Sequence, residues 1–123
     1  MTGDDKPRRV EVKNGDETVA TAEVAEHGEG TIRTSLLPSS RPTPPGSRAD
    51  LVDAVMDLPE VQASSRLEAT VPLGDAESLE RLRERTENIV TRPAGSTALV
   101  DADIPPASRA EPGQEPGGQA SAP

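Results

Sequence analysis

The chain has 123 residues, a formal net charge of −9 at pH 7, and no Phe, Tyr, Trp or Cys. This length supports one domain with tails, and its core must be built from aliphatic side chains and alanine. The missing cysteines exclude thiol catalysis, disulfides and Cys-zinc sites. The acidic charge and the missing aromatic rings argue against a nucleic-acid partner, because phosphate backbones attract clustered Lys and Arg, and single strands stack on aromatic side chains.

The first third of the chain predicts three strands after a polar tail at residues 1–7. RRVEVK alternates apolar with charged residues, and Asn14-Gly15 then favours a hairpin turn. TVATAEVA continues as a strand, although its alanines are also compatible with a helix. The EHGEG turn leads to TIRTSLL, which alternates as a third strand.

With no apolar segment long enough for a signal peptide or a membrane span, we expect a cytoplasmic protein without a membrane partner.

The middle of the chain predicts a helix and then a strand. A proline-rich loop, SSRPTPPGS, leads into a helix at about 48–58, with Ser47 as its N-cap and Pro59 as its end. The RLEATVP segment alternates apolar and polar residues, so it predicts a half-buried strand at 67–72.

A second helix follows in GDAESLERLRERTE. Asp75 is its expected N-cap, and Leu79 and Leu82 share one face. Glu77 and Arg81 have the i,i+4 spacing of a surface ion pair.

A last hairpin follows, with its turn at PAGS, and a Pro/Gly-rich tail begins at residue 105. The order βββ-α-β-α-ββ predicts a single α/β domain at 8–104, with a mixed, mostly antiparallel sheet and two helices. The tail at 105–123 is expected to be a linker-like, disordered segment.

This order resembles the core and C-terminal part of GNAT-type N-acyltransferases over residues 17–104. Arg41, Gly46 and the LVDAV run stand where that family has a phosphate-binding loop, R/Q-x-x-G-x-G/A, and the helix after it. GDAESLERLRER resembles the family's second helix. The resemblance implies a truncated GNAT-like fold, acetyl-CoA or another acyl-CoA as cofactor, and acyl transfer to an amine. The composition also resembles that of short actinobacterial proteins.

The same junctions depart from the family pattern. Pro44 takes the place of the first loop glycine, and Pro42, Pro44 and Pro45 lack the N–H that would bind a pyrophosphate. Asp75 stands where the family often has Asn, and Leu82 stands where it commonly has a Tyr that serves as general acid. These departures predict a protein without catalytic residues and without a cofactor.

The candidate anion contacts lie at the start of the first predicted helix. Arg41, Gly46, Ser47 and Arg48 combine a helix N-terminus with two guanidinium groups, which could hold a phosphate or the phosphates of an acyl-CoA. Asp50 and Asp53 follow within two turns and already complement the helix dipole.

Other polar residues admit a functional role, but a solvated surface explains each one. His27 could act as a general base, or bind a metal with Glu26 and Glu29. It is more simply a histidine in an exposed turn.

Two carboxylate pairs also admit a functional and a structural interpretation. Glu68 and Asp75 bracket the 67–72 strand as a possible acid/base pair, although Glu68 should face solvent and Asp75 should cap. Asp101 and Asp103 share a strand face that could hold a cation. We expect no catalytic residue and no metal ligand among them.

The preferred functional prediction is a non-catalytic protein that acts by protein interaction, through self-association as a homo-oligomer or with a protein partner. A small aliphatic core has little energy to offset the entropy of ordering, and association would bury more apolar surface. Two alternatives stay open: an acyl-CoA-dependent N-acyltransferase or vestigial acyl-CoA binder, and an adaptor that works through the 105–123 tail.

Overall fold

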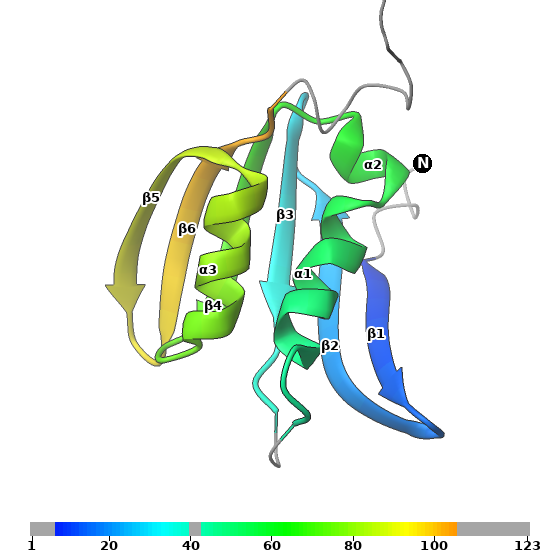
Figure 1. The fold of residues 1–123 in the computed structure, drawn as a ribbon. Coiled ribbons are helices and arrows are strands. Elements are labelled where there is room, and N and C mark those ends of the chain that lie inside the picture. The colour runs from blue at the N-terminus through cyan, green and yellow to red at the C-terminus, as the bar shows by residue number, and fades with distance from the viewer. Residues whose placement is uncertain (1–6, 40–42, 106–123) are drawn as a thin grey trace, which may run out of the picture.

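The computed structural model describes residues 7–39 and 43–105, which form one sheet with three helices (Figure 1). Arg41, and nearly all of the two tails expected at 1–7 and 105–123, lie outside the described residues. The elements in chain order are β1 (Arg8–Asn14), β2 (Glu17–Glu26), β3 (Thr31–Leu36), α1 (Ser47–Met56), α2 (Pro59–Gln62), β4 (Arg66–Pro72), α3 (Ala76–Arg85), β5 (Glu87–Ala94) and β6 (Thr97–Asp103).

The strands are ordered β1-β2-β3-β4-β6-β5 across the sheet. β3 pairs with β4 in parallel, with Ile32 opposite Leu67, whereas every other neighbouring pair of described strands is antiparallel. A parallel pair needs a crossover connection, and α1 and α2 supply it. The predicted mixed, mostly antiparallel sheet is confirmed.

The first hairpin forms where the sequence predicts it. Gly15 takes φ +68° in the turn between β1 and β2, a backbone conformation that costs glycine little. The alanine-rich segment after the turn is a strand. Its residues alternate between a buried face, with Ala20, Ala22 and Val24, and a half-exposed face.

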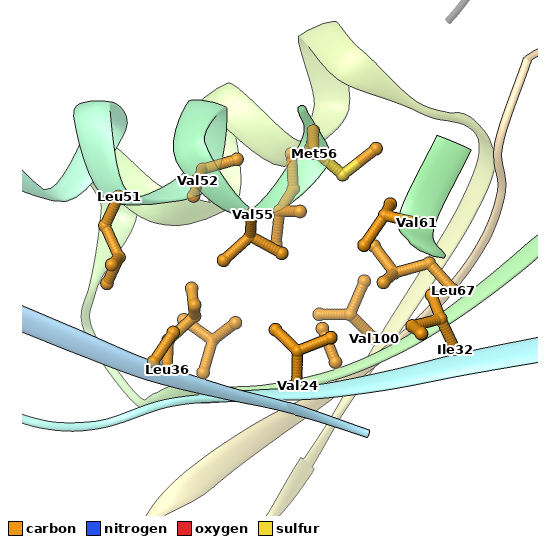
Figure 2. Close-up of a cluster of buried hydrophobic side chains, with 14 of the residues drawn as sticks. Val24, Ile32, Leu36, Leu51, Val52, Val55, Met56, Val61, Leu67 and Val100 are labelled. Carbon is orange, nitrogen blue, oxygen red and sulfur yellow. The ribbon is translucent and has the colours of Figure 1, made fainter. Parts of the chain in front are cut away.

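All three helices lie on one face of the sheet (Figure 1). Figure 2 shows the core between α1 and the strands. Branched aliphatic side chains and Met56 fill the volume that aromatic rings fill in other proteins. α1 contributes four buried apolar side chains, Leu51, Val52, Val55 and Met56. α3 contributes only Leu82 as a fully buried apolar side chain, so polar contacts to α1 must hold much of this helix.

Two details of the helices correct the sequence predictions. Ser47 is not the N-cap of α1: Gly46 holds that position with φ +89°, and Ser47 is the first helical residue and buried. Glycine suits this left-handed conformation, which a serine would adopt only at a cost. Pro59 does not simply end the helical region, because it begins the short helix α2, where its missing N–H removes no hydrogen bond.

The second face of the sheet carries none of the described helices. It carries mainly polar and charged side chains, among them Arg33, Glu68, Arg66 and Asp101, together with the half-buried Leu99. We call this surface the open face. None of the described helices is long and apolar enough to cross a membrane.

Candidate functional site

Both long helices begin at the same edge of the sheet. β3 and β4 are parallel, so their carboxyl ends meet at one edge, and α1 follows β3 while α3 follows β4 (Figure 1). In open α/β sheets, ligands bind outside the carboxyl ends of strands where the chain order changes direction. We call the residues gathered here, 37–39, 46–49 and 74–78, the helix-start edge.

Arg48 is the central side chain of the helix-start edge. Its Nε donates to Asp75 Oδ2 at 3.0 Å, and its Nη1 donates to Leu37 O at 2.9 Å and to Ser39 Oγ at 3.3 Å. Nη2 lies 2.8 Å from the same Asp75 oxygen, without the alignment of a hydrogen bond. The Arg48 and Asp75 side chains are only 9% and 11% exposed, so this is a buried ion pair.

Asp75 also caps its own helix, as the sequence predicts. Its Oδ1 accepts from the Ser78 N–H at 3.2 Å, and its Oδ2 accepts from Ser78 Oγ at 2.6 Å. Ser78 is fully buried, and its hydroxyl fixes the carboxylate against the helix. Asp75 therefore joins the start of α3 to Arg48 of α1 and, through it, to the end of β3.

Glu77 lies in the first turn of α3 and reaches across to α1. Its Oε2 accepts from the Ala49 N–H at 3.0 Å, which satisfies one donor of the first turn of α1. The predicted pair of Glu77 with Arg81 is wrong. Arg81 instead contacts Glu84 at 2.7 Å and Asp53 at 3.5 Å.

An open groove of about 450 Å³ adjoins this network. Leu37 and Ser39, which accept hydrogen bonds from Arg48, also line the groove. The rest of its wall comes from the start of β2, with Asn14 before it, and from Pro38, Thr43 and Pro44 between β3 and α1. Its volume is in the range of small-molecule sites in proteins.

Further along the helix pair, carboxylates of α1 and of its C-cap, Asp57, bind arginines of α3. Arg85 donates to Asp53 Oδ1 at 2.7 Å and to Asp57 Oδ1 at 2.8 Å. Burial lowers the pKa of Arg85, but the hydrogen bonds to Asp57 and Asp53 outweigh it and raise the pKa above its ordinary value. These contacts fix α3 against α1 where α3 has few apolar contacts of its own.

The structure separates Glu68 from Asp75, so the two do not form an acid/base pair. Glu68 lies on the open face, where its Oε1 accepts from Arg33 Nη2 at 2.9 Å and from Arg33 Nε at 3.2 Å. The hydrogen bonds from Arg33 lower the pKa of the Glu68 carboxyl. His27 Nε2 lies 3.1 Å from Arg33 Nη2, at the amino end of β3 and away from the helix-start edge.

No metal site is found at the residues considered from the sequence. Asp103 accepts from Arg66 at 3.1 Å and from Asn88 at 2.9 Å, and Asp101 lies 3.8 Å from Arg66. Within residues 7–39 and 43–105, no group of three or more His, Asp or Glu side chains is placed to hold a metal ion.

Solved structures of acetyltransferases share this fold. No protein-family model matches the sequence, and a comparison with curated proteins gives no match. yncA, a putative acetyltransferase from Salmonella typhimurium solved with its cofactor acetyl-CoA, matches with a TM-score of 0.57 and 10% identity, over 89% of this chain and 70% of that chain. An acetyltransferase of the GNAT family from Streptococcus pneumoniae matches with a TM-score of 0.57 and 11% identity, over 82% and 68%.

The N-acetyltransferase PseH of Campylobacter jejuni, in complex with acetyl coenzyme A, is also similar, with a TM-score of 0.55, 10% identity, and coverage of 82% of this chain and 70% of that chain. At this identity the likeness shows the fold alone. The chain has a GNAT-like fold, and the resemblance drawn from the sequence is confirmed at that level.

These neighbours correct two sequence predictions. We expected a non-catalytic protein that acts by interaction, with no cofactor; the structural neighbours are acetyltransferases, two of them solved with acetyl-CoA, and they favour the acyl-CoA alternative on both points. The loop prolines lack N–H donors, but the fold brings the Ala49 N–H and the Arg48 guanidinium together at the helix-start edge. A homo-oligomer and a protein partner stay predictions.

The structure places Gly46, Ser47 and Arg48 at the start of α1, where Arg48 contacts a carboxylate and the Ser47 N–H donates to Pro44 O at 3.1 Å; whether they contact an anionic ligand stays a prediction. The site also contains residues that the sequence did not single out. Ser39 and the Leu37 carbonyl were missed because nothing in a loop sequence shows which helix it meets. Glu77 was assigned only a local partner. Its contact with α1 could have been predicted from the position of Glu77 in the first turn of one helix, close to the start of another.

Proposed function

We propose that this protein binds an acyl-coenzyme A at the helix-start edge and transfers the acyl group to an amine. The observation that carries the proposal is the chemistry of the donors there. The Ala49 N–H and the Arg48 guanidinium already hold anionic oxygens, at 3.0 Å and 2.8–3.0 Å. Carboxylate and phosphate oxygens attract the same donors, an amide of a helix N-terminus and a planar guanidinium.

These donors therefore fit the phosphate groups of coenzyme A, with two carboxylates of the protein at present bound to them. The first turn of α1 and Arg48 would hold the phosphates, and the groove beside Leu37 and Ser39 would take another part of the ligand. When bound, an acyl-CoA supplies an activated thioester carbonyl. The likeness to acetyltransferases, some solved with acetyl-CoA, supports this assignment over other anionic ligands.

The chain offers few groups for proton transfer. It has no Tyr and no Cys, and its one histidine, His27, lies at the opposite end of β3 from the helix-start edge. Asp75 is held by Arg48 and Ser78. Acyl transfer would then depend on positioning of an already neutral amine beside the thioester, which can supply a large part of a rate enhancement. Its rate should follow the ionisation of the acceptor amine.

Calorimetric titration with acetyl-CoA tests binding. We expect a dissociation constant tighter than about 100 μM, which corresponds to roughly −5.5 kcal/mol. Arg48→Lys should weaken the affinity because lysine keeps the charge but loses the guanidinium fork. Arg33→Lys, the same change on the open face, is the matched control and should leave the affinity unchanged. Absence of binding at millimolar acetyl-CoA would contradict the proposal.

Transfer can be followed by release of the free thiol of coenzyme A in the presence of a panel of primary amines. The protein has no cysteine, so a thiol reagent reports coenzyme A alone. We expect thiol release that requires both the protein and an amine. Binding without amine-dependent release would refute the transfer step and leave an acyl-CoA-binding protein.

A further inference from the structure

The two carboxylates at the helix-start edge are held very differently. Asp75 makes contacts through both oxygens, to the Ser78 N–H, the Ser78 hydroxyl and Arg48. Glu77 makes one hydrogen bond, to the Ala49 N–H, and its residue is only half-buried. Asp75 is thus fixed by three partners, whereas Glu77 can leave by rotation of its own side chain.

Glu77 occupies a position that an anionic ligand would also take. The N-terminus of a helix favours negative charge, and its free N–H groups bind phosphate or carboxylate oxygens. A ligand phosphate next to the Glu77 carboxylate would place two like charges on one donor, which repel each other strongly in a partly buried site. Ligand binding at Ala49 therefore requires that Glu77 withdraw.

A second position for Glu77 is available one turn along the same helix. Arg81 stands at i+4 from Glu77, the spacing at which Glu and Arg side chains meet. Arg81 Nη1 pairs with Glu84 at 2.7 Å, but its Nε is buried and has no hydrogen-bond partner among the described residues, with Asp53 at 3.5 Å. A shallow, open groove of about 290 Å³ is lined by both residues, together with Ala49, Glu80 and Glu84.

We propose that Glu77 is a two-position switch that regulates the proposed acyl-CoA site. In one position it caps α1 at Ala49 and competes with the ligand. In the other it pairs with Arg81 and leaves the start of α1 open. This inference rests on the proposed function, because the ligand that displaces Glu77 is the acyl-CoA of that proposal. The switch requires only two positions of the Glu77 side chain, and the backbone conformation does not change.

The charge of Glu77 can be removed with little change in shape. Glu77→Gln keeps an oxygen that can accept from Ala49 but lacks the charge that repels a phosphate. We expect it to bind acetyl-CoA about tenfold more tightly than the natural protein, the effect of one charge-assisted hydrogen bond. Glu87→Gln makes the same charge change at an exposed position just after α3, outside this groove, and should alter the affinity less than twofold.

The second position is tested through its arginine. Arg81→Met removes the partner that receives Glu77, so we expect weaker binding of acetyl-CoA in this variant. Arg83→Met, which removes an exposed arginine of the same helix, is the control for charge. In the Glu77→Gln background, Arg81→Met should have no further effect. Opposite signs for the two single variants exclude a common loss of stability, and the absence of a further effect in the double variant separates a switch from two independent charge effects.

The outcomes separate the switch from the proposed function. Binding of acetyl-CoA by the natural protein with no gain in Glu77→Gln would overturn the switch and leave the function intact. If no variant binds acetyl-CoA, the acyl-CoA proposal fails, and inorganic pyrophosphate becomes the probe. Tighter pyrophosphate binding by Glu77→Gln would then uphold the switch, and equal or absent binding would refute it. Circular dichroism of each variant establishes that it is folded.

Discussion

The helix-start edge and the open face of the sheet use the same pair of groups in opposite environments. Arg48 and Asp75 are 9% and 11% exposed, and each has further partners in the fold. Arg33 and Glu68, across β3 and β4, are 52% and 34% exposed. Water screens the second pair more than the first, so the similar distances of 2.8 Å in the first and 2.9 Å in the second do not mean equal energies.

The difference matters for how the fold is held. α3 has one fully buried apolar side chain, Leu82, so its attachment to α1 depends on Arg48, Asp75 and the ion pairs of Arg85. Removal of one partner from such a buried pair leaves an uncompensated charge. On the open face, the remaining partner simply returns to water. Three changes measure this contrast.

The largest effect is expected for Arg48→Met. It leaves the Asp75 carboxylate buried without its cation, which should lower the free energy of unfolding by about 3–5 kcal/mol. Urea denaturation of the variant and the natural protein measures the loss. Adding Asp75→Ser, which can still cap α3, should recover part of the stability. A double variant less stable than Arg48→Met alone would show that the unpaired charge is not the cause.

A smaller effect is expected for Glu77→Ala. The Ala49 N–H loses its acceptor, as at a deleted helix cap, and the free energy of unfolding should fall by about 1 kcal/mol. Glu80→Ala, one turn on at an exposed position, should cost no more than a few tenths of that value. Equal losses for the two variants would mean that the contact of Glu77 with α1 contributes nothing to stability.

The smallest effect is expected for Arg33→Ala, which should cost less than about 1 kcal/mol at neutral pH. The hydrogen bonds from Arg33 lower the pKa of Glu68 in the folded state, so their stabilisation is complete above the ordinary value of 4.5. It is lost as the pH falls through the lowered pKa. The variant should therefore show a flatter loss of stability in acid than the natural protein, with Arg9→Ala as the control. If Arg33→Ala and the natural protein lost stability equally in acid, Arg33 would not be the cause of the lowered pKa of Glu68.

The sequence predicted the features of the fold that depend on neighbouring residues, namely the strands, a turn and a helix cap. Alternation located the strands, and Asn14-Gly15 and Asp75 marked a turn and a cap that the structure contains. The prediction of Ser47 as N-cap was wrong by one residue, because Gly46 adopts a left-handed conformation and takes the cap position one residue earlier. The alanine-rich strand β2 was ambiguous because its identity is decided by pairing with β1 and β3.

The site was harder to predict because it is assembled across the chain. Glu77 meets Ala49 and Arg48 meets Asp75 at separations of 28 and 27 residues, and no local spacing encodes such contacts. The sequence showed instead that Glu77 could pair with Arg81 at i+4. Tertiary packing gives it a stronger partner, the first turn of α1, which carries part of a helix dipole.

The central claim is that an acyl-CoA meets the protein at the first turn of α1. Amide chemical shifts of the ¹⁵N-labelled protein, followed during a titration with acetyl-CoA, test it residue by residue. We expect the largest changes at Ser47, Arg48 and Ala49, with smaller ones at Glu77 and none at Arg33 on the open face. Changes confined to the open face, or no changes at saturating acetyl-CoA, would contradict the account.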